Sequence, residues 1–313
     1  MTLNERIDAL EGRLQAADAT LRLMRNAPMA RYTTLHLGGP ASLLACPDKQ
    51  EQVQLLLKEA HALDVPVIII GNGSNLLVKD GGIRGLVIRL CRDMQHIEVQ
   101  GNAIRAEAGA MMSTLSMAAA EANLAGLTFA SGIPGTVGGG VYMNAGAYGG
   151  EMSQVVTLVE GYDMTGEPFS YNHYEMQFGH RRTRLMAENK LVTHVTFELH
   201  HGRREELLAE MVDFNTRRAE KQPLTKFSAG STFKRPENGY ASAMVDQCGL
   251  KGFAVGGAQV SEKHAGFCIN NGGTAADFLQ LIAEVQKAVY EKFGTMLEPE
   301  VRILGEDAPV TEA

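Results

Sequence analysis

The sequence predicts an α+β fold that is divided into more than one domain. Short apolar runs bounded by Gly or Pro alternate with segments in which apolar residues recur every three or four positions, and these patterns are typical of strands and helices. A length of 313 residues suggests about two or three domains with hydrophobic cores of their own. The 34 glycines are concentrated in a few loops, which marks places where the backbone closely approaches a neighbour or a ligand.

Composition excludes several classes of protein. The chain has 29 Lys plus Arg and 36 Asp plus Glu, a net charge of -7, which argues against a broad nucleic-acid-binding surface. The histidines form no metal-ligand motif, and Cys46, Cys91, Cys248 and Cys268 form no C-x-x-C pair, so we expect reduced thiols and no metal site. The apolar run 65–70 is too short to span a bilayer, and no signal peptide opens the chain. We expect a cytoplasmic protein without membrane insertion.

Residues 1–26 predict an N-terminal amphipathic helix. Thr2 and Glu5 have the spacing of a capping box at its start. Its apolar positions recur at alternating steps of four and three and are Leu3, Ile7, Leu10, Leu14, Ala17, Leu21 and Met24. This stripe favours packing on the helix's own domain. The alternative is a short coiled-coil seam between two copies, so the chain is expected to be a monomer or a weak dimer.

Residues 27–92 predict a first small domain of mixed strands and helices. Its predicted elements are strands at 32–37 and 41–46, a helix at 49–63, and strands at 67–70, 76–78 and 85–90. The apolar strand at 67–70 runs directly into the loop Gly-Asn-Gly-Ser-Asn at 71–75, which we call the first glycine loop.

Residues 93–220 predict a second domain. Its predicted elements are strands at 96–99 and 103–106, a helix at 111–122, strands at 155–162 and 191–199, and a polar helix at 203–220. The stretch 130–146, which we call the second glycine segment, lies at its centre. A basic stretch, His-Arg-Arg-Thr-Arg, occupies 180–184.

The last domain is predicted at 221–313. Lys-Gln-Pro-Leu-Thr at 221–225 interrupts the helical periodicity, which places the boundary there. The elements predicted beyond it are helices at 240–248 and 274–293 and strands at 265–269 and 301–304.

The two glycine-rich stretches suggest a site for a diphosphate cofactor. Exposed backbone N–H groups after a strand can line an anion, although the first glycine loop alone would more often be a tight turn. The second stretch is longer and adds Ser, Thr and Asn donors. The chain contains no G-x-G-x-x-G, no P-loop and no G-x-S-x-G, so a Rossmann fold, a P-loop fold and a serine-hydrolase elbow are not indicated.

Seven motifs occur in order between Tyr32 and Gly305, and together they are specific. They are Tyr-Thr-Thr-Leu-His-Leu-Gly-Gly-Pro-Ala (32–41), Gly-Asn-Gly-Ser-Asn-Leu-Leu (71–77), Ser-Gly-Ile-Pro-Gly-Thr-Val-Gly-Gly (131–139), Asn-Ala-Gly-Ala-Tyr-Gly (144–149), Ser-Ala-Gly-Ser-Thr-Phe-Lys-Arg-Pro (228–236), Gly-Gly-Ala-Gln-Val-Ser-Glu-Lys-His-Ala-Gly-Phe (256–267) and Leu-Glu-Pro-Glu-Val-Arg (297–302). Through these seven motifs the chain resembles the UDP-N-acetylenolpyruvoylglucosamine reductase (MurB) family.

The resemblance implies a fold and a reaction. The fold is a two-subdomain FAD-binding fold of the vanillyl-alcohol-oxidase (PCMH) type, followed by a C-terminal α+β substrate-binding domain. The reaction is reduction of UDP-N-acetylglucosamine enolpyruvate to UDP-N-acetylmuramate for peptidoglycan synthesis, with FAD as cofactor and NADPH as reductant. The short stretch between Arg181 and Ser231 is similar to the shorter class of the family, which lacks the inserted substrate-covering segment.

The resemblance also implies which residues hold FAD. They lie in the glycine-rich stretches and the basic segment, and are Gly38, Gly39, Gly71, Asn72, Gly73, Ser74, Asn75, Ser131, Gly132, Pro134, Gly135, Thr136, Gly138, Asn144, Gly146 and Arg181.

Three residues match the family's catalytic positions. Ser231 occupies the position of the proton-donating serine, and Glu300 that of a glutamate expected to face the substrate carboxylate. Arg181 corresponds to the arginine of a Tyr-Arg-x-Ser motif, where a guanidinium can hold a carboxylate. Here His180 and Thr183 replace the Tyr and the Ser, so the neighbouring arginines compete for the assignment, and we favour Arg181.

Lys226, Lys234 and Arg235 form a local basic cluster that suits the substrate diphosphate, although a solvated basic face is the alternative. Gln259 and Asn270 are weaker candidates for substrate contacts, and Tyr148 suits either a ligand or the core. Two rival functions remain at this point. One is an oxidase on the same fold that passes electrons to oxygen, and the other is a UDP-sugar-binding regulator without catalysis.

Overall fold

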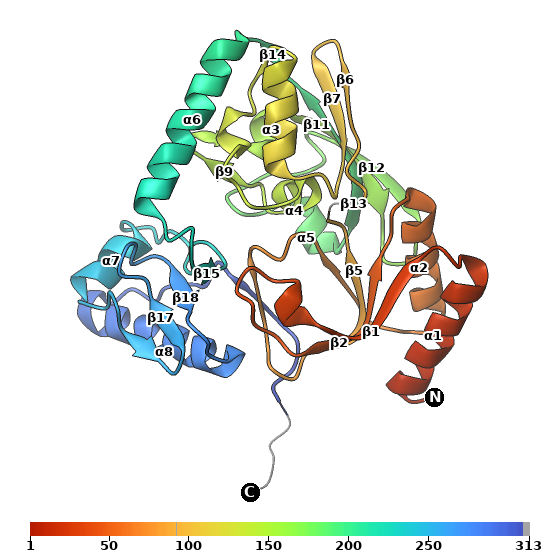
Figure 1. Ribbon diagram of the computed structural model, residues 1–313, viewed down its shortest axis with the longest axis horizontal. Helices are drawn as coiled ribbons and strands as arrows, with labels where there is room; N and C mark the ends of the chain where they lie inside the picture. The colour runs from red at the N-terminus through yellow and green to blue at the C-terminus, as the bar shows by residue number, and fades with distance from the viewer. Residues whose placement is uncertain (92, 309–313) are drawn as a thin grey trace, which may run out of the picture. The chain divides into compact units, whose positions relative to one another are not determined.

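The computed structural model describes residues 1–91 and 93–308 and divides the chain into two compact units. Unit 1 comprises Met1–Arg25, Leu43–Asn72 and Gly85–Arg218, and unit 2 comprises Asn26–Ser42, Gly73–Arg84 and Ala219–Ala313. Both units mix helices with strands, as the α+β class predicts (Figure 1). The boundary predicted after residue 220 lies close to the division at Arg218. The separation of 27–92 from 93–220 stays a prediction.

Unit 1 begins with helix α1 (Leu3–Ala17), which starts at the predicted capping box of Thr2 and Glu5. Its apolar stripe packs against α2 (Gln50–Ala62) within the unit, and Ile7, Leu10 and Leu14 have no exposed side-chain surface. The stripe is therefore used inside the chain, as we favoured.

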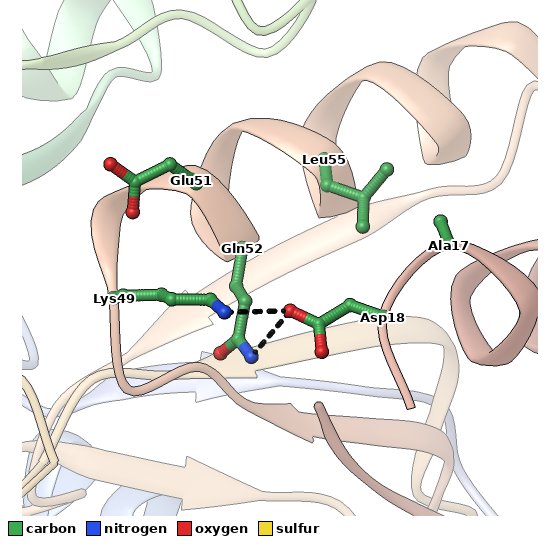
Figure 2. A pocket seen from close by; sticks show the side chains of 6 residues that line it. All are labelled: Ala17, Asp18, Lys49, Glu51, Gln52 and Leu55. Carbon is green, nitrogen blue, oxygen red and sulfur yellow. Dashed lines mark hydrogen bonds and ion pairs between the residues drawn. The ribbon is translucent and has the colours of Figure 1, made fainter. Parts of the chain in front are cut away.

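The N-terminal helix is shorter than the predicted 1–26. It ends at Ala17, and strand β1 (Arg22–Pro28) follows. The carboxylate of Asp18 accepts hydrogen bonds from the backbone N–H of Thr20 (2.9 Å) and from its hydroxyl, and such local bonds compete with helical ones. Lys49 and Gln52 also bind this carboxylate, each at 3.0 Å (Figure 2). The cluster fixes the point where the helix stops.

The first sheet has the strand order β1-β2-β5-β3. Its strands beyond β1 are β2 (Pro40–Cys46), β5 (Ile83–Arg89) and β3 (Val67–Ile70), and β3 pairs with β5 in parallel. The strand predicted at 32–37 is wrong, because this stretch follows the 3-10 turn η1 (Met29–Arg31) as an irregular loop. His36 has a left-handed φ of 53°, and the Thr33 hydroxyl donates to the Leu37 carbonyl at 3.0 Å, which closes the loop on itself.

The second sheet of unit 1 has five antiparallel strands in the order β12-β11-β13-β7-β6. They are β6 (Ile97–Gln100), β7 (Ala103–Glu107), β11 (Val156–Tyr162), β12 (Pro168–Asn172) and β13 (Leu191–Glu198). Helices α3 (Met112–Glu121) and α4 (Val137–Tyr142) contact each other, and α4 packs on β13 and β7. Helix α6 (Arg204–Lys221) packs Leu207 and Met211 against Ala120 of α3.

Short elements complete unit 1. They are β8 (Leu124–Ala125), η2 (Thr128–Ala130), β9 (Gly146–Ala147), β10 (Gly150–Glu151), η3 (Met152–Gln154), α5 (Arg184–Glu188) and β14 (His200–His201). The sequence analysis did not predict β12, α4 or α5, which are short and lack a full period of apolar residues.

Unit 2 is built on the antiparallel sheet β15-β18-β17-β16, with helix α8 (Ala275–Phe293) packed on β16 and β17 and against α7 (Ala241–Gln247) (Figure 1). The strands are β15 (Phe227–Ser228), β16 (Ala254–Val255), β17 (Ala258–Val260) and β18 (Cys268–Asn270), and a separate parallel pair joins β4 (Leu76–Val78) to β19 (Arg302–Leu304). The carboxylate of Asp80 accepts from the backbone N–H groups of Ala275 and Ala276, both at 2.9 Å, and so caps α8. In the part of the chain that the structure describes, no helix has the length and apolarity needed to cross a membrane.

Candidate flavin and substrate site

The two glycine-rich stretches meet in unit 1. The side-chain amide of Asn72 donates to the carbonyl of Pro134 at 2.7 Å. A Cβ atom on Gly71 would collide with the hydroxyl of Thr136, so glycine is required at that position. The strand β3 and the cap of α4 therefore bring together two stretches that the sequence assigned to one cofactor.

The two stretches differ in what their backbones offer. The N–H groups of residues 72–75 donate to no described residue. In contrast, Val137 and Gly138 at the start of α4 donate to Ala110 (2.8 Å) and Ala108 (2.9 Å), and Gly139 donates to the Thr136 hydroxyl (3.4 Å). Donors for an anion are thus available in the first glycine loop, whereas the helix start in the second segment is occupied by the protein itself.

Ser131 gives the second segment a polar group that lacks a partner. Its side chain is 8 % exposed, and its hydroxyl makes no hydrogen bond to a described residue. A buried hydroxyl without a partner is costly, so it marks a place where a ligand group completes the structure. This hydroxyl and the open N–H group of Asn72, both in unit 1, fit a polar cofactor such as FAD.

Several predicted cofactor residues have a structural reason to be glycine. A Cβ atom on Gly39 would collide with the Asp80 carbonyl, and one on Gly38 would lie 2.7 Å from the Cβ of Val78. A Cβ atom on Gly138 would lie 2.8 Å from the Cβ of Ala108, and one on Gly146 would lie 2.6 Å from the Gly150 carbonyl. Close packing accounts for these glycines, and their contact with a cofactor stays a prediction.

Arg181 lies in a tight turn of unit 1 between β12 and α5. Gly179 and Arg182 exchange backbone hydrogen bonds of 2.9 and 3.1 Å, and Arg181 has a left-handed φ of 52° at the turn. Its side chain is half-buried, whereas that of Arg182 is exposed. Arg184 is engaged elsewhere, because it bonds Glu188 at 2.7 Å and its guanidinium covers the ring of Tyr171. These differences favour Arg181 over its neighbours for a ligand-binding role.

Ser231 and Glu300 lie on adjacent backbone segments of unit 2. The N–H of Glu300 donates to the carbonyl of Thr232 at 2.8 Å, and Phe233 pairs with Pro299 as an isolated bridge. The Thr232 hydroxyl accepts from the N–H of Cys268 at 2.9 Å, which anchors the segment to β18. Ser231 is exposed and Glu300 is half-buried, so both side chains remain accessible within the unit.

The first glycine loop touches the same segment. The side-chain amide of Asn75 donates to the Glu300 carbonyl at 3.2 Å, and its own carbonyl accepts from the N–H of Arg302 at 3.0 Å. The end of the first glycine loop and the Glu300 backbone are therefore fixed to each other inside unit 2.

The predicted basic cluster has mixed surroundings. Lys226 is exposed. Lys234 forms an ion pair with Glu298, and the guanidinium of Arg235 lies 4.2 Å from the ring centre of Tyr240. The three residues are not a single uniform patch, and their role in diphosphate binding stays a prediction.

Gln259 and Asn270 use their side-chain amides within unit 2. Asn270 is buried, donates to the Leu35 carbonyl at 2.9 Å and accepts from the N–H groups of Gly272 and Gly273. Gln259 donates to the Gly252 carbonyl at 3.0 Å and accepts from Asn271 at 2.8 Å. These bonds give both residues a structural role, and the substrate contacts expected for them have no support in this geometry.

Arg218 and Tyr148 connect α6 to the cofactor segments. The Arg218 guanidinium donates to the Gly132 carbonyl, and the ring of Tyr148 stacks on Phe214 at 4.3 Å while its hydroxyl donates to the Phe214 carbonyl at 3.0 Å. The ring of Tyr148 packs on α6, but the residue is 41 % exposed, so its two alternatives both stay predictions. The sequence analysis missed Arg218 because a basic residue on a charged helix carries no signal of a partner so distant in sequence.

The pocket between α1 and α2 is a different feature. Its lining is Ala17, Asp18, Lys49, Glu51, Gln52 and Leu55, and it contains none of the predicted site residues (Figure 2). Asp18 binds both Lys49 and Gln52 there, so these three polar side chains satisfy one another. Among residues 1–91 and 93–308, no three His, Cys, Asp or Glu side chains gather as a metal site.

Two parts of the chain each match a known protein family, and the matches agree with the predicted FAD-binding and substrate-binding parts. Residues 41–170 match the FAD binding domain family, and residues 222–304 match the family described as UDP-N-acetylenolpyruvoylglucosamine reductase, C-terminal domain. The first match covers both glycine-rich stretches, and the second covers Ser231 and Glu300.

Whole-chain relatives carry the same description. The UDP-N-acetylenolpyruvoylglucosamine reductase of Clostridioides difficile is 46% identical over 281 residues, which is 90% of this chain and 92% of that protein. That of Pediococcus pentosaceus is 46% identical over 288 residues, or 92% and 96% of the two chains. A crystal structure of the MurB reductase from Thermus caldophilus aligns with a TM-score of 0.77 and 34% identity, covering 90% of this chain and 98% of that one. The chain belongs to the UDP-N-acetylenolpyruvoylglucosamine reductase family and is an FAD-binding oxidoreductase.

Proposed function

We propose that the chain reduces UDP-N-acetylglucosamine enolpyruvate to UDP-N-acetylmuramate, a step of peptidoglycan synthesis, with NADPH as the electron donor. The observation that carries the proposal is the pairing of the Ser231 and Glu300 segments, which places a hydroxyl and a carboxyl on neighbouring backbones of a chain whose relatives are named for this reductase. Both partners are small molecules, and the reaction needs no metal.

The reaction adds two electrons and two hydrogens across the enol double bond. FAD, held by the glycine-rich stretches, would supply a hydride to C3 of the enolpyruvyl group. Negative charge then develops on C2 and on the carboxylate attached to it, and a proton must reach C2 to complete the product. The chain therefore has to supply an electrostatic stabiliser and a proton donor.

Ser231 is the proposed proton donor to C2. A serine hydroxyl is a weak acid, but an enolate carbon is a strong base, so a short positioned transfer suffices. The buried Thr232 next to it bonds to β18 and holds the backbone of Ser231 in place.

Arg181 and Glu300 are the proposed groups for the substrate carboxylate. A guanidinium binds a carboxylate with two parallel hydrogen bonds and gains strength as charge develops there. Glu300 is half-buried on the segment next to Ser231 and is proposed to face the substrate carboxylate.

The substrate diphosphate is assigned to basic residues of unit 2. Lys226 and Arg235 are exposed, and Lys234 is held by Glu298. A diphosphate can compete with a single carboxylate for this lysine because it carries more charge.

An anaerobic stopped-flow experiment tests the proposal. The flavin of the purified protein is reduced with NADPH, UDP-N-acetylglucosamine enolpyruvate is added, and flavin absorbance near 450 nm reports reoxidation. Rapid reoxidation by this substrate is expected. Ser231→Ala is expected to abolish it while reduction by NADPH continues, and Ser231→Cys, which keeps a transferable proton, is expected to retain part of the rate.

Other results would overturn the proposal. No reoxidation by this substrate, followed by reoxidation when oxygen is then admitted, would indicate an oxidase. A protein that binds no flavin would indicate a binding role without redox chemistry. Full activity in Ser231→Ala would leave the reductase in place and remove the proton-donor assignment.

A further inference from the structure

The turn that carries Arg181 is tied at both ends to the C-terminal end of helix α4. At one end, the side-chain amide of Asn144 donates to the Gly179 carbonyl at 3.0 Å. At the other end, the hydroxyl of Thr183 donates to the Tyr142 carbonyl at 2.8 Å. All of these residues belong to unit 1, and Arg181 lies between the two tethers.

Asn144 combines a backbone role with this bond. It follows the end of α4 with a left-handed φ of 45°, its N–H donates to Val141 (3.1 Å), and the next N–H, of Ala145, donates to Gly140 (2.7 Å). This is the pattern of a Schellman C-cap, in which Gly is the usual residue and Asn the common alternative. The side chain is 2 % exposed, and its oxygen also accepts from the N–H of Ser153 at 2.9 Å. Both the nitrogen and the oxygen of the Asn144 amide therefore bond to the protein. This argues that Asn144 positions the Arg181 turn and does not contact the cofactor directly.

Thr183 precedes helix α5 at the position where a threonine normally caps the helix. Its side chain makes no capping bond, and it is 1 % exposed. The hydroxyl instead reaches the carbonyl of Tyr142, the last residue of α4. The Thr183 hydroxyl therefore bonds to the end of α4 and does not cap α5.

Helix α4 thereby links the Arg181 turn to the glycine-rich stretches. Its first turn is capped by Thr136, whose hydroxyl lies against Gly71 of the first glycine loop. Its last turn holds the Arg181 turn through Tyr142 and Asn144. A six-residue helix therefore fixes the arginine relative to the loops proposed for the flavin.

We infer that Asn144 and Thr183 are positioning residues that hold the guanidinium of Arg181 in its reactive place. This inference rests on the proposed function, because it assigns them to the arginine proposed there. Arg181 adopts a left-handed backbone that non-glycine residues adopt infrequently, so the turn needs outside bonds to select it. Loss of either tether lets the turn populate other conformations and lowers the fraction of enzyme with the arginine in place.

Thr183→Val tests the inference because it removes the hydroxyl and keeps the shape. The rate of flavin reoxidation by UDP-N-acetylglucosamine enolpyruvate is expected to fall about tenfold or more, the equivalent of one lost hydrogen bond. Thr183→Ser is expected to restore most of the rate. Asn144→Gly keeps the left-handed backbone and removes only the amide, and the same loss is expected. Flavin reduction by NADPH and the spectrum of bound flavin are expected to be unchanged in Thr183→Val and Thr183→Ser, which separates positioning from loss of the cofactor site.

A double-mutant cycle decides whether the tethers act through the arginine. Arg181→Ala is expected to slow reoxidation strongly, and adding Thr183→Val to it is expected to cause no further loss. Additive losses would overturn the inference while leaving the proposed role of Arg181 intact. Full activity in Arg181→Ala would instead overturn that proposed role. Loss of bound flavin in both Thr183→Val and Asn144→Gly would show that the tethers serve the cofactor, and would overturn the inference as well.

Discussion

Asn72 donates its side-chain amide to the carbonyl of Pro134 at 2.7 Å, which joins two glycine-rich stretches 62 residues apart in the chain. The loop after β3 and the segment before α4 are thereby held at one place in unit 1. The contact depends on Gly71, since any larger residue there would collide with the Thr136 hydroxyl. The first glycine loop is thus fixed at its start by Asn72, while its amides stay open for a ligand.

Asn72→Ala is expected to weaken FAD binding about five- to tenfold. The substitution removes one hydrogen bond, a loss of about 1 kcal/mol, and releases the loop whose N–H groups are open. Titration of flavin-free protein with FAD, followed by flavin fluorescence, measures the Kd. Asn102→Ala, in the exposed turn between β6 and β7, is the control and should leave the Kd unchanged. Equal Kd values for both variants would contradict a role for the Asn72 bond.

Ser131→Ala is expected to separate stability from cofactor affinity. The buried Ser131 hydroxyl has no partner in the described chain, so its removal should leave the Tm of the flavin-free protein unchanged or raise it. Affinity for FAD should fall about fivefold or more, because the ligand loses a hydrogen bond. Ser116→Ala provides a matched control, since that buried hydroxyl bonds the Leu127 carbonyl at 2.8 Å.

The Ser116 variant should show the opposite pattern, with a lower Tm and an unchanged Kd for FAD. A lower Tm in flavin-free Ser131→Ala with no change in the Kd would mean that the Ser131 hydroxyl serves the protein and has no ligand.

Sequence patterns predicted the elements with clear periodicity. The predicted strands at 67–70 and 76–78 coincide with β3 and β4, and the helix predicted at 49–63 differs from α2 by one residue at each end. Apolar runs bounded by Gly and helices with a complete apolar face carry their signal locally, which explains this agreement.

Elements determined by distant or side-chain bonds were not predicted. The N-terminal apolar period continues to Met24, yet the helix stops at Ala17 because Asp18 bonds Thr20 and Gln52 instead. The strand predicted at 32–37 fails because its alternating residues surround a His36 with positive φ.

In the candidate site, too, hydrogen bonds between residues distant in sequence were not predicted. Motifs identified Arg181, Ser231 and Glu300 as candidates. No local pattern shows that the side-chain amide of Asn144 donates to the Gly179 carbonyl, or that the amide of Asn270 donates to the Leu35 carbonyl. Such partners become visible only after folding, because sequence spacing does not fix which loops meet.

Leu10→Ala is expected to destabilise the protein by about 2–5 kcal/mol, since the Leu10 side chain is fully buried in the core of unit 1 and its loss leaves a cavity. Urea unfolding of the flavin-free protein measures the loss. Val212→Ala, on the exposed side of α6 with 65 % of its side chain exposed, should cost less than about 0.5 kcal/mol. Sedimentation of both variants tests the alternative use of the α1 stripe. A change of oligomeric state in Leu10→Ala without loss of stability would point to a seam between copies.

Asp18→Asn is expected to remove a pH-dependent part of the stability. Hydrogen bonds from Thr20, then from Gln52 and Lys49, hold the pKa of the Asp18 carboxyl well below its usual range. A lowered folded-state pKa stabilises the protein at pH values above the unfolded pKa of about 4, and this stabilisation is lost as pH falls toward the folded pKa. The Tm of the wild type should therefore exceed that of Asp18→Asn at pH 7, and the difference should shrink below about pH 4.

Differential scanning calorimetry of both proteins between pH 7 and pH 3 measures this difference. Asp213→Asn is the control, because Asp213 forms an exposed ion pair with Arg217 on α6, and such pairs contribute little at any pH. A Tm difference between wild type and Asp18→Asn that stays constant down to pH 3 would show that the bonds to Asp18 act through shape alone. The charge of the carboxylate would then have no part in ending α1 at Ala17.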